Sequence, residues 1–236
     1  MVKKDELEAL EDRVNRQLAA RAKAEGMKDD PITDGVVNID EYIACSPRMP
    51  WVLREPWETP DTDEAVGGWS LTQELLAQGR VADNKGALPP IAYVTYSVLN
   101  CFPPCQDIPY LTESPEVRGA LRKIAYMNVK KFPNVKKPGN KIAYAPDIKE
   151  FYCRYRDILL DQIATIDPHI VIFGGTRPLF TQDLGLTDNL LSRRGSVAFC
   201  RQGQRLYIEA HHPAQRTITK SQYVDDIASL IKTEWH

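Results

Sequence analysis

Short apolar runs that end in polar or turn-forming residues recur along the chain. Four of them are Trp51–Leu53, Ile124–Met127, Ile170–Phe173 and Leu206–Glu209. Apolar runs of this length without polar alternation are typical of strands buried on both faces of a parallel sheet. A further run at Ser196–Cys200 precedes the turn residues Gln202-Gly203, so the sequence also predicts a hairpin with the last strand.

Helical periodicity fills the intervals between these runs. Residues Lys4–Glu25 place Leu7, Leu10, Val14 and Leu18 at helical spacing, and Gly26 ends the pattern. Further helices are predicted at Ser70–Gln78, at Ile91–Leu99, from about Ser114, at Asp147–Ile166 and at Lys220–Lys232. Strands that alternate with helices predict a three-layer α/β/α fold around a central, mostly parallel four-stranded sheet. We expect residues 1–30 to form an accessory helix outside this domain, away from its crevice, and residues 31–236 to form the domain.

Composition supports a globular protein and excludes few functions. Of the 236 residues 43% are hydrophobic and 26% charged, and the formal net charge is −2. This charge gives no support for nucleic-acid binding through bulk charge, although a local basic face is compatible with it. No apolar run approaches the roughly 20 residues that span a bilayer, and the first residues lack the apolar core of a signal peptide. We expect a cytoplasmic monomer that does not contact membranes.

The cysteines favour reduced thiols over a disulfide framework. Their number, five, is odd, and only Cys101-Phe-Pro-Pro-Cys105 is a close pair. A metal or iron–sulfur site at this pair is the less favoured alternative because no second pair matches it. We therefore predict neither a metal nor a cofactor.

Polar groups follow each of the four predicted inner strands. Glu55 follows the first, Asn128 and then Lys130 the second, Gly174-Gly-Thr176 the third, and His211-His212 the fourth. Parallel α/β sheets bind ligands at the carboxyl ends of their strands, so these groups are candidates for one site.

Each of these groups also has a structural interpretation. Glu55 is a possible salt-bridge partner of Arg54, Asn128 a possible tie between two loops, and one histidine of the pair a structural residue. Gly174-Gly175 is a common turn, which would also leave backbone N–H groups free for a phosphate. Lys130 and Lys131 are either solvated charges or phosphate contacts.

Four motifs resemble those of the uracil-DNA glycosylase superfamily, closest in style to its single-strand-selective type. They are Leu53-Arg-Glu-Pro-Trp57, Ile124-Ala-Tyr-Met-Asn128, Phe173-Gly-Gly-Thr176 and His212-Pro-Ala-Gln-Arg216, in the order of the family. The resemblance extends from about Asp34 to the carboxyl terminus. It implies a glycosylase that hydrolyses the N-glycosidic bond of uracil or another deaminated base in DNA, for DNA repair by base excision.

The resemblance also implies a role for each matching residue. Glu55 and His212 would be catalytic. The substrate would be bound by Asn128, Trp57, Pro56 and Arg54. Single- or double-stranded DNA would be contacted by Arg216, Gln215, Gly175, Thr176 and Lys130, with Arg216 as the wedge that holds the base stack open.

Two alternatives stay open from the sequence. Leu53 stands where the family has glycine, and Ala214-Gln215 stands in place of Ser-Pro. These departures and the net charge favour a superfamily member that binds a free nucleotide or nucleic acid without cleaving it. Glu55, Asn128 and His212 together favour the enzyme. The remaining alternative is an unrelated α/β enzyme that acts on a small phosphorylated or nucleoside substrate.

Overall fold

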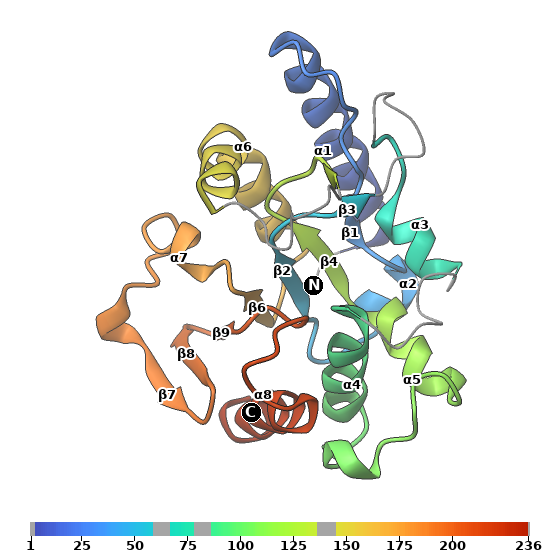
Figure 1. Cartoon of the computed structure of the whole chain (residues 1–236), viewed down its shortest axis with the longest axis vertical. Coiled ribbons are helices and arrows are strands. Elements are labelled where there is room, and N and C mark those ends of the chain that lie inside the picture. Colours follow the sequence, from blue (N-terminus) through green and yellow to red (C-terminus); the bar gives the residue numbers. More distant parts are fainter. Residues whose placement is uncertain (1–2, 59–66, 78–85, 136–144, 236) are drawn as a thin grey trace.

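The chain forms an α/β structure around a mixed, seven-stranded sheet (Figure 1). The computed structural model describes residues 3–58, 67–77, 86–135 and 145–235. The strand order is β1-β4-β2-β6-β9-β8-β7. The sheet consists of β1 (Gly35–Val36), β2 (Pro50–Leu53), β4 (Ala125–Asn128), β6 (Ile170–Gly174), β7 (Ser192–Arg194), β8 (Val197–Gln202) and β9 (Arg205–Ala210).

The four predicted strands are neighbours and mutually parallel, in the order β4, β2, β6, β9. The predicted hairpin is confirmed, because β8 pairs with β9 antiparallel and Gln202 lies opposite Arg205. The expectation of a four-stranded sheet is wrong in size, since β1, β8 and β7 extend it through antiparallel pairs. β1 has only two residues and β7 is polar and exposed, so neither produces an apolar run.

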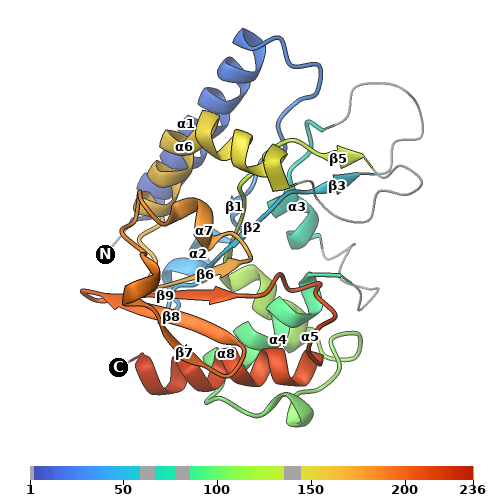
Figure 2. The ribbon, with the colours of Figure 1, turned by 60° about the vertical axis from the view of Figure 1, so that its left-hand side comes forward.

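Helices cover both faces of the sheet (Figure 2). They are α1 (Lys4–Ala24), α2 (Ile39–Ile43), α3 (Leu71–Leu76), α4 (Leu88–Leu99), α5 (Pro115–Gly119), α6 (Ala145–Thr165), α7 (Arg177–Phe180) and α8 (Lys220–Glu234). Trp51 and Leu53 pack with α4 and α8, whereas Val52 packs on the opposite face with α1 and α6. This alternation along β2 is what a central strand with two buried faces requires.

The first helix buries the apolar stripe predicted for it. Leu7, Leu10, Val14 and Leu18 are buried in the cluster that also contains residues of α6 and of the sheet. Glu11 of α1 accepts a hydrogen bond from the backbone N of Val36 in β1 at 2.9 Å. α1 is thus tied to the sheet by packing and by a polar contact, and the domain boundary near residue 30 stays a prediction.

Within the described residues, no helix has both the length and the apolar character that crossing a membrane requires. The cysteines of the close pair are free thiols, with Cys101 exposed and Cys105 buried.

Candidate functional site

The segments that follow β2 and β4 continue side by side beyond the sheet. Leu53 pairs with Asn128 in register, and the backbone N of Lys130 then donates to the carbonyl of Arg54 at 2.8 Å. The backbone N of Asn134 donates to the carbonyl of Pro56 at 2.8 Å. These bonds fix Glu55 and Asn128 at the carboxyl ends of two neighbouring parallel strands, where the sequence predicts the site.

Glu55 is a buried carboxylate with one oxygen unpartnered. Only 8% of the residue is exposed. Its Oε1 accepts a hydrogen bond from Asn134 Nδ2 at 3.2 Å, while its Oε2 has no hydrogen-bond partner within the described residues. Burial raises the pKa of Glu55, and the hydrogen bond from Asn134 and the charge of Lys130 oppose that rise. The proposed salt bridge with Arg54 is absent from the ion pairs of the described residues, where Arg54 acts on Glu55 only through its field.

Asn128 shows the same incomplete pairing. The residue is 2% exposed, and its Oδ1 has no hydrogen-bond partner in the described part of the chain. Its backbone N donates to Asp34 Oδ2 at 2.7 Å. A buried acceptor without a partner costs about 1–3 kcal/mol, so Asn128 Oδ1 is available to a hydrogen-bond donor at this strand end.

Asp34 is a site component that the sequence reasoning missed. It is buried and forms an ion pair with the ammonium of Lys131, which also donates to Gln162 Oε1 at 3.0 Å. Lys131 is therefore a structural residue rather than a solvated charge or a phosphate contact. Asp34 lies directly before β1, where the sequence pattern marks no functional residue. Only its hydrogen bond with the backbone N of Asn128 shows that it supports the candidate site.

His212 follows β9 and is neutral at physiological pH. Its Nδ1 accepts a hydrogen bond from the backbone N of Ala214 at 3.2 Å, which places the proton on Nε2. Burial, followed by the positive charge of Arg54, lowers the pKa of His212 to about 4. The imidazole is thus a neutral donor through Nε2–H.

The turn after β6 lies between Arg54 and His212. Gly175 has a φ of +75°, and a Cβ there would lie 3.2 Å from Arg54 Nη2 and 3.7 Å from the backbone N of His212. At Gly174 a Cβ would collide with the side chain of Leu53. The glycines thus let the ends of β2, β6 and β9 approach closely.

Two of the groups in this turn are already hydrogen-bonded within the protein. The backbone N of Gly175 donates to the carbonyl of Ala210 at 2.9 Å, so it is not the free N–H group expected there. Thr176 is 1% exposed, and its hydroxyl donates to the carbonyl of Val52 at 2.7 Å. Both groups hold the turn against neighbouring strands, which is a structural role.

The loop after His212 presents Arg216 to solvent. Gln215 Oε1 accepts hydrogen bonds from the backbone N of Thr217 at 2.5 Å and of Ile218 at 3.0 Å, so its side chain is used to shape the loop. Arg216 is exposed. A groove of about 270 Å³ lies beside it, lined by Pro89, Pro90, Pro213, Ala214, Arg216 and Lys220 among others.

Three further predicted residues lie near Glu55. Lys130 is 9% exposed and its Nζ lies 5.1 Å from the ring centroid of Phe151. Pro56 is buried. Trp57 pairs through its backbone with Asn134, as β3 (Trp57–Glu58) joins β5 (Asn134–Val135), and its side chain lies outside the described part of the structure.

The strand ends therefore place Glu55 and Asn128 after neighbouring strands, and the charge of Arg54 acts on both Glu55 and His212. That a single pocket encloses all three, with Trp57 as its wall, stays a prediction. Neither a family model nor a curated protein matches this chain.

Proposed function

We propose that the protein is a DNA base glycosylase of the uracil-DNA glycosylase superfamily that removes uracil or another deaminated base. The observation that supports this most is the pair of unpartnered buried acceptors, Glu55 Oε2 and Asn128 Oδ1, at neighbouring strand ends. A ligand that brings hydrogen-bond donors to both would remove the penalty of leaving them unpaired. A neutral imidazole at the end of β9 adds a donor to the same edge.

Asn128 suits the edge of a deaminated base. Deamination turns an exocyclic amine into a carbonyl and leaves an N–H on the neighbouring ring nitrogen, in uracil, hypoxanthine and xanthine alike. Asn128 Oδ1 accepts from that ring N–H while its amide N–H donates to the carbonyl. Cytosine and adenine present the reverse pattern, which leaves the buried oxygen of Asn128 unpaired in the orientation that the amide has in the structure and so disfavours them.

Glu55 acts on the sugar side of the scissile bond. With Oε1 held by Asn134, Oε2 accepts a hydrogen bond from the attacking water and orients it. As the bond between the sugar C1′ and the base nitrogen breaks, the base keeps the electron pair. Water oxygen bonds to C1′ and its proton passes to the carboxylate. The negative charge of Glu55 also stabilises the oxocarbenium character of the sugar.

His212 acts on the departing base. The base becomes anionic as it leaves, and a neutral Nε2–H that is already oriented donates a hydrogen bond to its carbonyl oxygen. The low pKa of His212, about 4, keeps the imidazole neutral, so it stabilises the anion without transferring a proton. The base reaches this position only outside the stack, and Arg216 on its exposed loop fills the space left in the duplex.

A glycosylase assay tests the proposal. Oligonucleotides that contain uracil, hypoxanthine or xanthine, single- and double-stranded, are incubated with the protein and abasic sites are counted after strand cleavage. We expect excision by the wild type and by Glu113→Gln, which changes an exposed glutamate outside the set of candidate site residues, and loss of excision in Glu55→Gln. Equal activity in Glu55→Gln and wild type would remove Glu55 from the mechanism.

Binding without cleavage is the second candidate. It is favoured by the burial of Glu55, which disfavours the charged form that a base must have, and by Leu53, which fills the space beside Gly174. In that case, uracil-containing DNA binds in a fluorescence anisotropy titration and Asn128→Ala weakens binding, while no abasic site forms with any substrate.

A further inference from the structure

A second pocket lies at the opposite, amino-terminal edge of the parallel strands. Its volume is about 760 Å³, within the range of small-molecule sites. Three segments line it, which are residues 43–48 before β2, residues 167–169 before β6, and residues 202–207 around the start of β9. The pocket is therefore built at the amino ends of β2, β6 and β9, whose carboxyl ends carry Glu55, the turn at Gly175 and His212 of the candidate glycosylase site.

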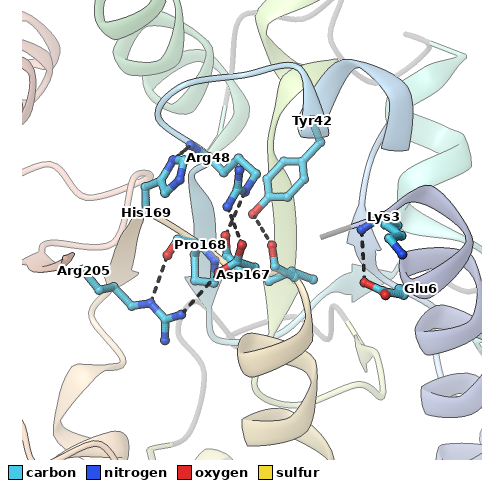
Figure 3. A network of polar contacts seen from close by, with 9 residues as sticks. Lys3, Glu6, Tyr42, Arg48, Asp167, Pro168, His169 and Arg205 are labelled. Atoms are coloured by element: carbon cyan, nitrogen blue, oxygen red, sulfur yellow. Dashed lines mark hydrogen bonds and ion pairs between the residues drawn. The ribbon is translucent and has the colours of Figure 1, made fainter. Parts of the chain in front are cut away.

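A polar network forms one side of this pocket (Figure 3). Arg48 donates from Nη2 to the carboxylate of Asp167 at 2.6 Å and from Nε to its carbonyl at 2.8 Å. Asp167 has a φ of +46°, a region that non-glycine residues seldom adopt, and Arg48 holds it there. The side chain of Arg48 is 6% exposed, so its charge is paired with Asp167 and is not available to a ligand.

Arg205 has donors left for a ligand. Its Nε donates to the carbonyl of Pro168 at 2.9 Å, which orients the guanidinium. Within the described residues its remaining N–H groups have only a 4.0 Å ion pair with Asp167 Oδ1. The side chain is 29% exposed, so it is both oriented and reachable. Such a fixed guanidinium binds phosphate or carboxylate oxygens through two parallel hydrogen bonds.

The neighbouring lining residues add donors and a positive field. The Nδ1 of His169 accepts from the backbone N of Arg48 at 3.0 Å, so its Nε2 carries the proton, and the ring stacks on Trp235 at 5.1 Å. Burial, and then the charge of Arg48, lowers the pKa of His169, which keeps it neutral. The charged lining residues are Arg48, Arg205 and Asp167, so one positive charge is in excess.

We propose that this pocket binds a small phosphomonoester, with its phosphate on the guanidinium of Arg205. The lining offers the donors of Arg205, the Nε2–H of His169 and the exposed amide of Gln204, which match the oxygens of an anion. The carboxylate of Asp167, which also lines the pocket, is held on the side of Arg48 by its ion pair. The volume exceeds what a bare phosphate fills, so the pocket has room for the organic part of the ligand. This site does not depend on the proposed glycosylase activity.

Isothermal titration with inorganic phosphate and with glycerol 3-phosphate tests the site. We expect both to bind, the ester more tightly, and Arg205→Gln to weaken binding by about tenfold or more through loss of charge-assisted hydrogen bonds. Arg193→Gln removes an equal charge from the exposed strand β7 and should change affinity less than twofold. Gln204→Glu places a negative charge at the rim without touching the network, and should also weaken binding.

Several outcomes would overturn the proposal. These are absence of binding at millimolar ester, equal loss in Arg205→Gln and Arg193→Gln, or loss in Arg216→Gln, which would place the phosphate at the opposite edge. Glu55→Gln should bind the ester as the wild type does, whether or not the protein cleaves DNA, so failure of either proposal is distinguishable from failure of the other.

Discussion

The two edges of the parallel sheet leave different sets of polar groups available. At the carboxyl edge, within the described residues, the buried unpaired atoms include the acceptors Glu55 Oε2 and Asn128 Oδ1, and the Nε2–H of His212 is a donor at the same edge. At the amino edge Oδ2 of Asp167 pairs with Arg48, Oδ1 of Asp167 lies 4.0 Å from Arg205, and Arg205 keeps N–H donors for a ligand. Because hydrogen bonding requires one donor and one acceptor, the two edges suit different ligands. In our proposals the carboxyl edge binds a donor-bearing base and a water, and the amino edge binds an oxyanion.

The edges also differ in how deeply their ion pairs lie. The side chains of Lys131 and Asp34, which support Asn128, are both 1% exposed. In the pair of Arg48 with Asp167, the aspartate side chain is 43% exposed. A buried charge that loses its partner is far more costly than one that water reaches. Loss of one partner of an ion pair should therefore lower the stability more at the carboxyl edge than at the amino edge.

Removal of one partner from each pair gives the largest expected effect. Lys131→Met leaves Asp34 charged and buried, and should lower the free energy of unfolding by about 3–5 kcal/mol. Arg48→Met leaves an aspartate that water solvates in part, and we expect a smaller loss. Urea denaturation at pH 7 measures both. Lys130→Met is the matched lysine control, because it removes the contact with Phe151 and a positive field at Glu55 but breaks no ion pair within the described residues. A greater loss in Arg48→Met than in Lys131→Met would reverse the comparison.

The next largest expected effect is a loss of excision rate in a variant at the carboxyl edge. His212→Ala removes the donor that we propose for the departing base, and loss of one such donor typically lowers the rate about 100- to 1000-fold. Arg205→Gln, at the other edge, should leave the rate within about twofold, because nothing in the proposed chemistry uses it. Single-turnover excision of uracil measures both variants. Comparable losses in both would contradict the assignment of chemistry to the carboxyl edge.

Arg216→Ala should lower the rate of excision from double-stranded DNA more than the rate from single-stranded DNA. Its proposed role is to occupy the space vacated by the flipped base, a task that exists only in a duplex. Excision from double-stranded substrate should fall by about tenfold, since insertion offsets part of an unpairing cost of a few kcal/mol. Excision from single-stranded substrate should change little. Equal losses on both substrates would refute the wedge.

The sequence predicted the inner part of the fold well because its signals are strong there. Continuous apolar runs marked the four parallel strands, and helical spacing marked α1, observed at Lys4–Ala24 against a predicted Lys4–Glu25. The short helix α2 was not predicted, since its five residues span little more than one turn. The prediction for Ser70–Gln78 is confirmed only as Leu71–Leu76 after the cap Ser70, and its last residue lies outside the described part.

The sequence predicted which strand ends carry the candidate residues, but not which of their polar groups are already hydrogen-bonded within the protein. Strand-end placement correctly located Glu55, Asn128 and His212 at one edge. It did not reveal that the backbone N of Gly175 and the hydroxyl of Thr176 donate to backbone carbonyls of Ala210 and Val52, since those partners lie on other strands. Asp34 was missed for the same reason, because its contact with Asn128 joins residues 94 apart in the chain. Polar pairing is a property of three-dimensional neighbours, and short motifs do not contain it.

The pH dependence of excision should reflect Glu55 alone on the acid side. The carboxylate must be ionised to act, and burial raises its pKa above the ordinary value for glutamate. His212 stays neutral down to about pH 4, so its protonation contributes only below that point. We expect the rate to fall about tenfold per pH unit below the raised pKa of Glu55. An acid limb at the ordinary glutamate value, measured under single-turnover conditions, would contradict the burial argument.

The smallest effect is a gain in stability when the unpaired carboxylate is neutralised. The folded-state pKa of Glu55 lies above its unfolded value, so folding favours the protonated form. That contribution is fully present below the unfolded pKa and is lost as the pH rises through the folded pKa. Glu55→Gln keeps the shape without this loss, and should be more stable than the wild type by about 1 kcal/mol at pH 8. The gain should vanish near pH 4. Thermal unfolding across this range measures it, with Glu113→Gln as the exposed control. A gain of equal size at both pH values would show that the charge of Glu55 is not its cause. The carboxyl edge would then have no destabilising buried charge that distinguishes it from the amino edge.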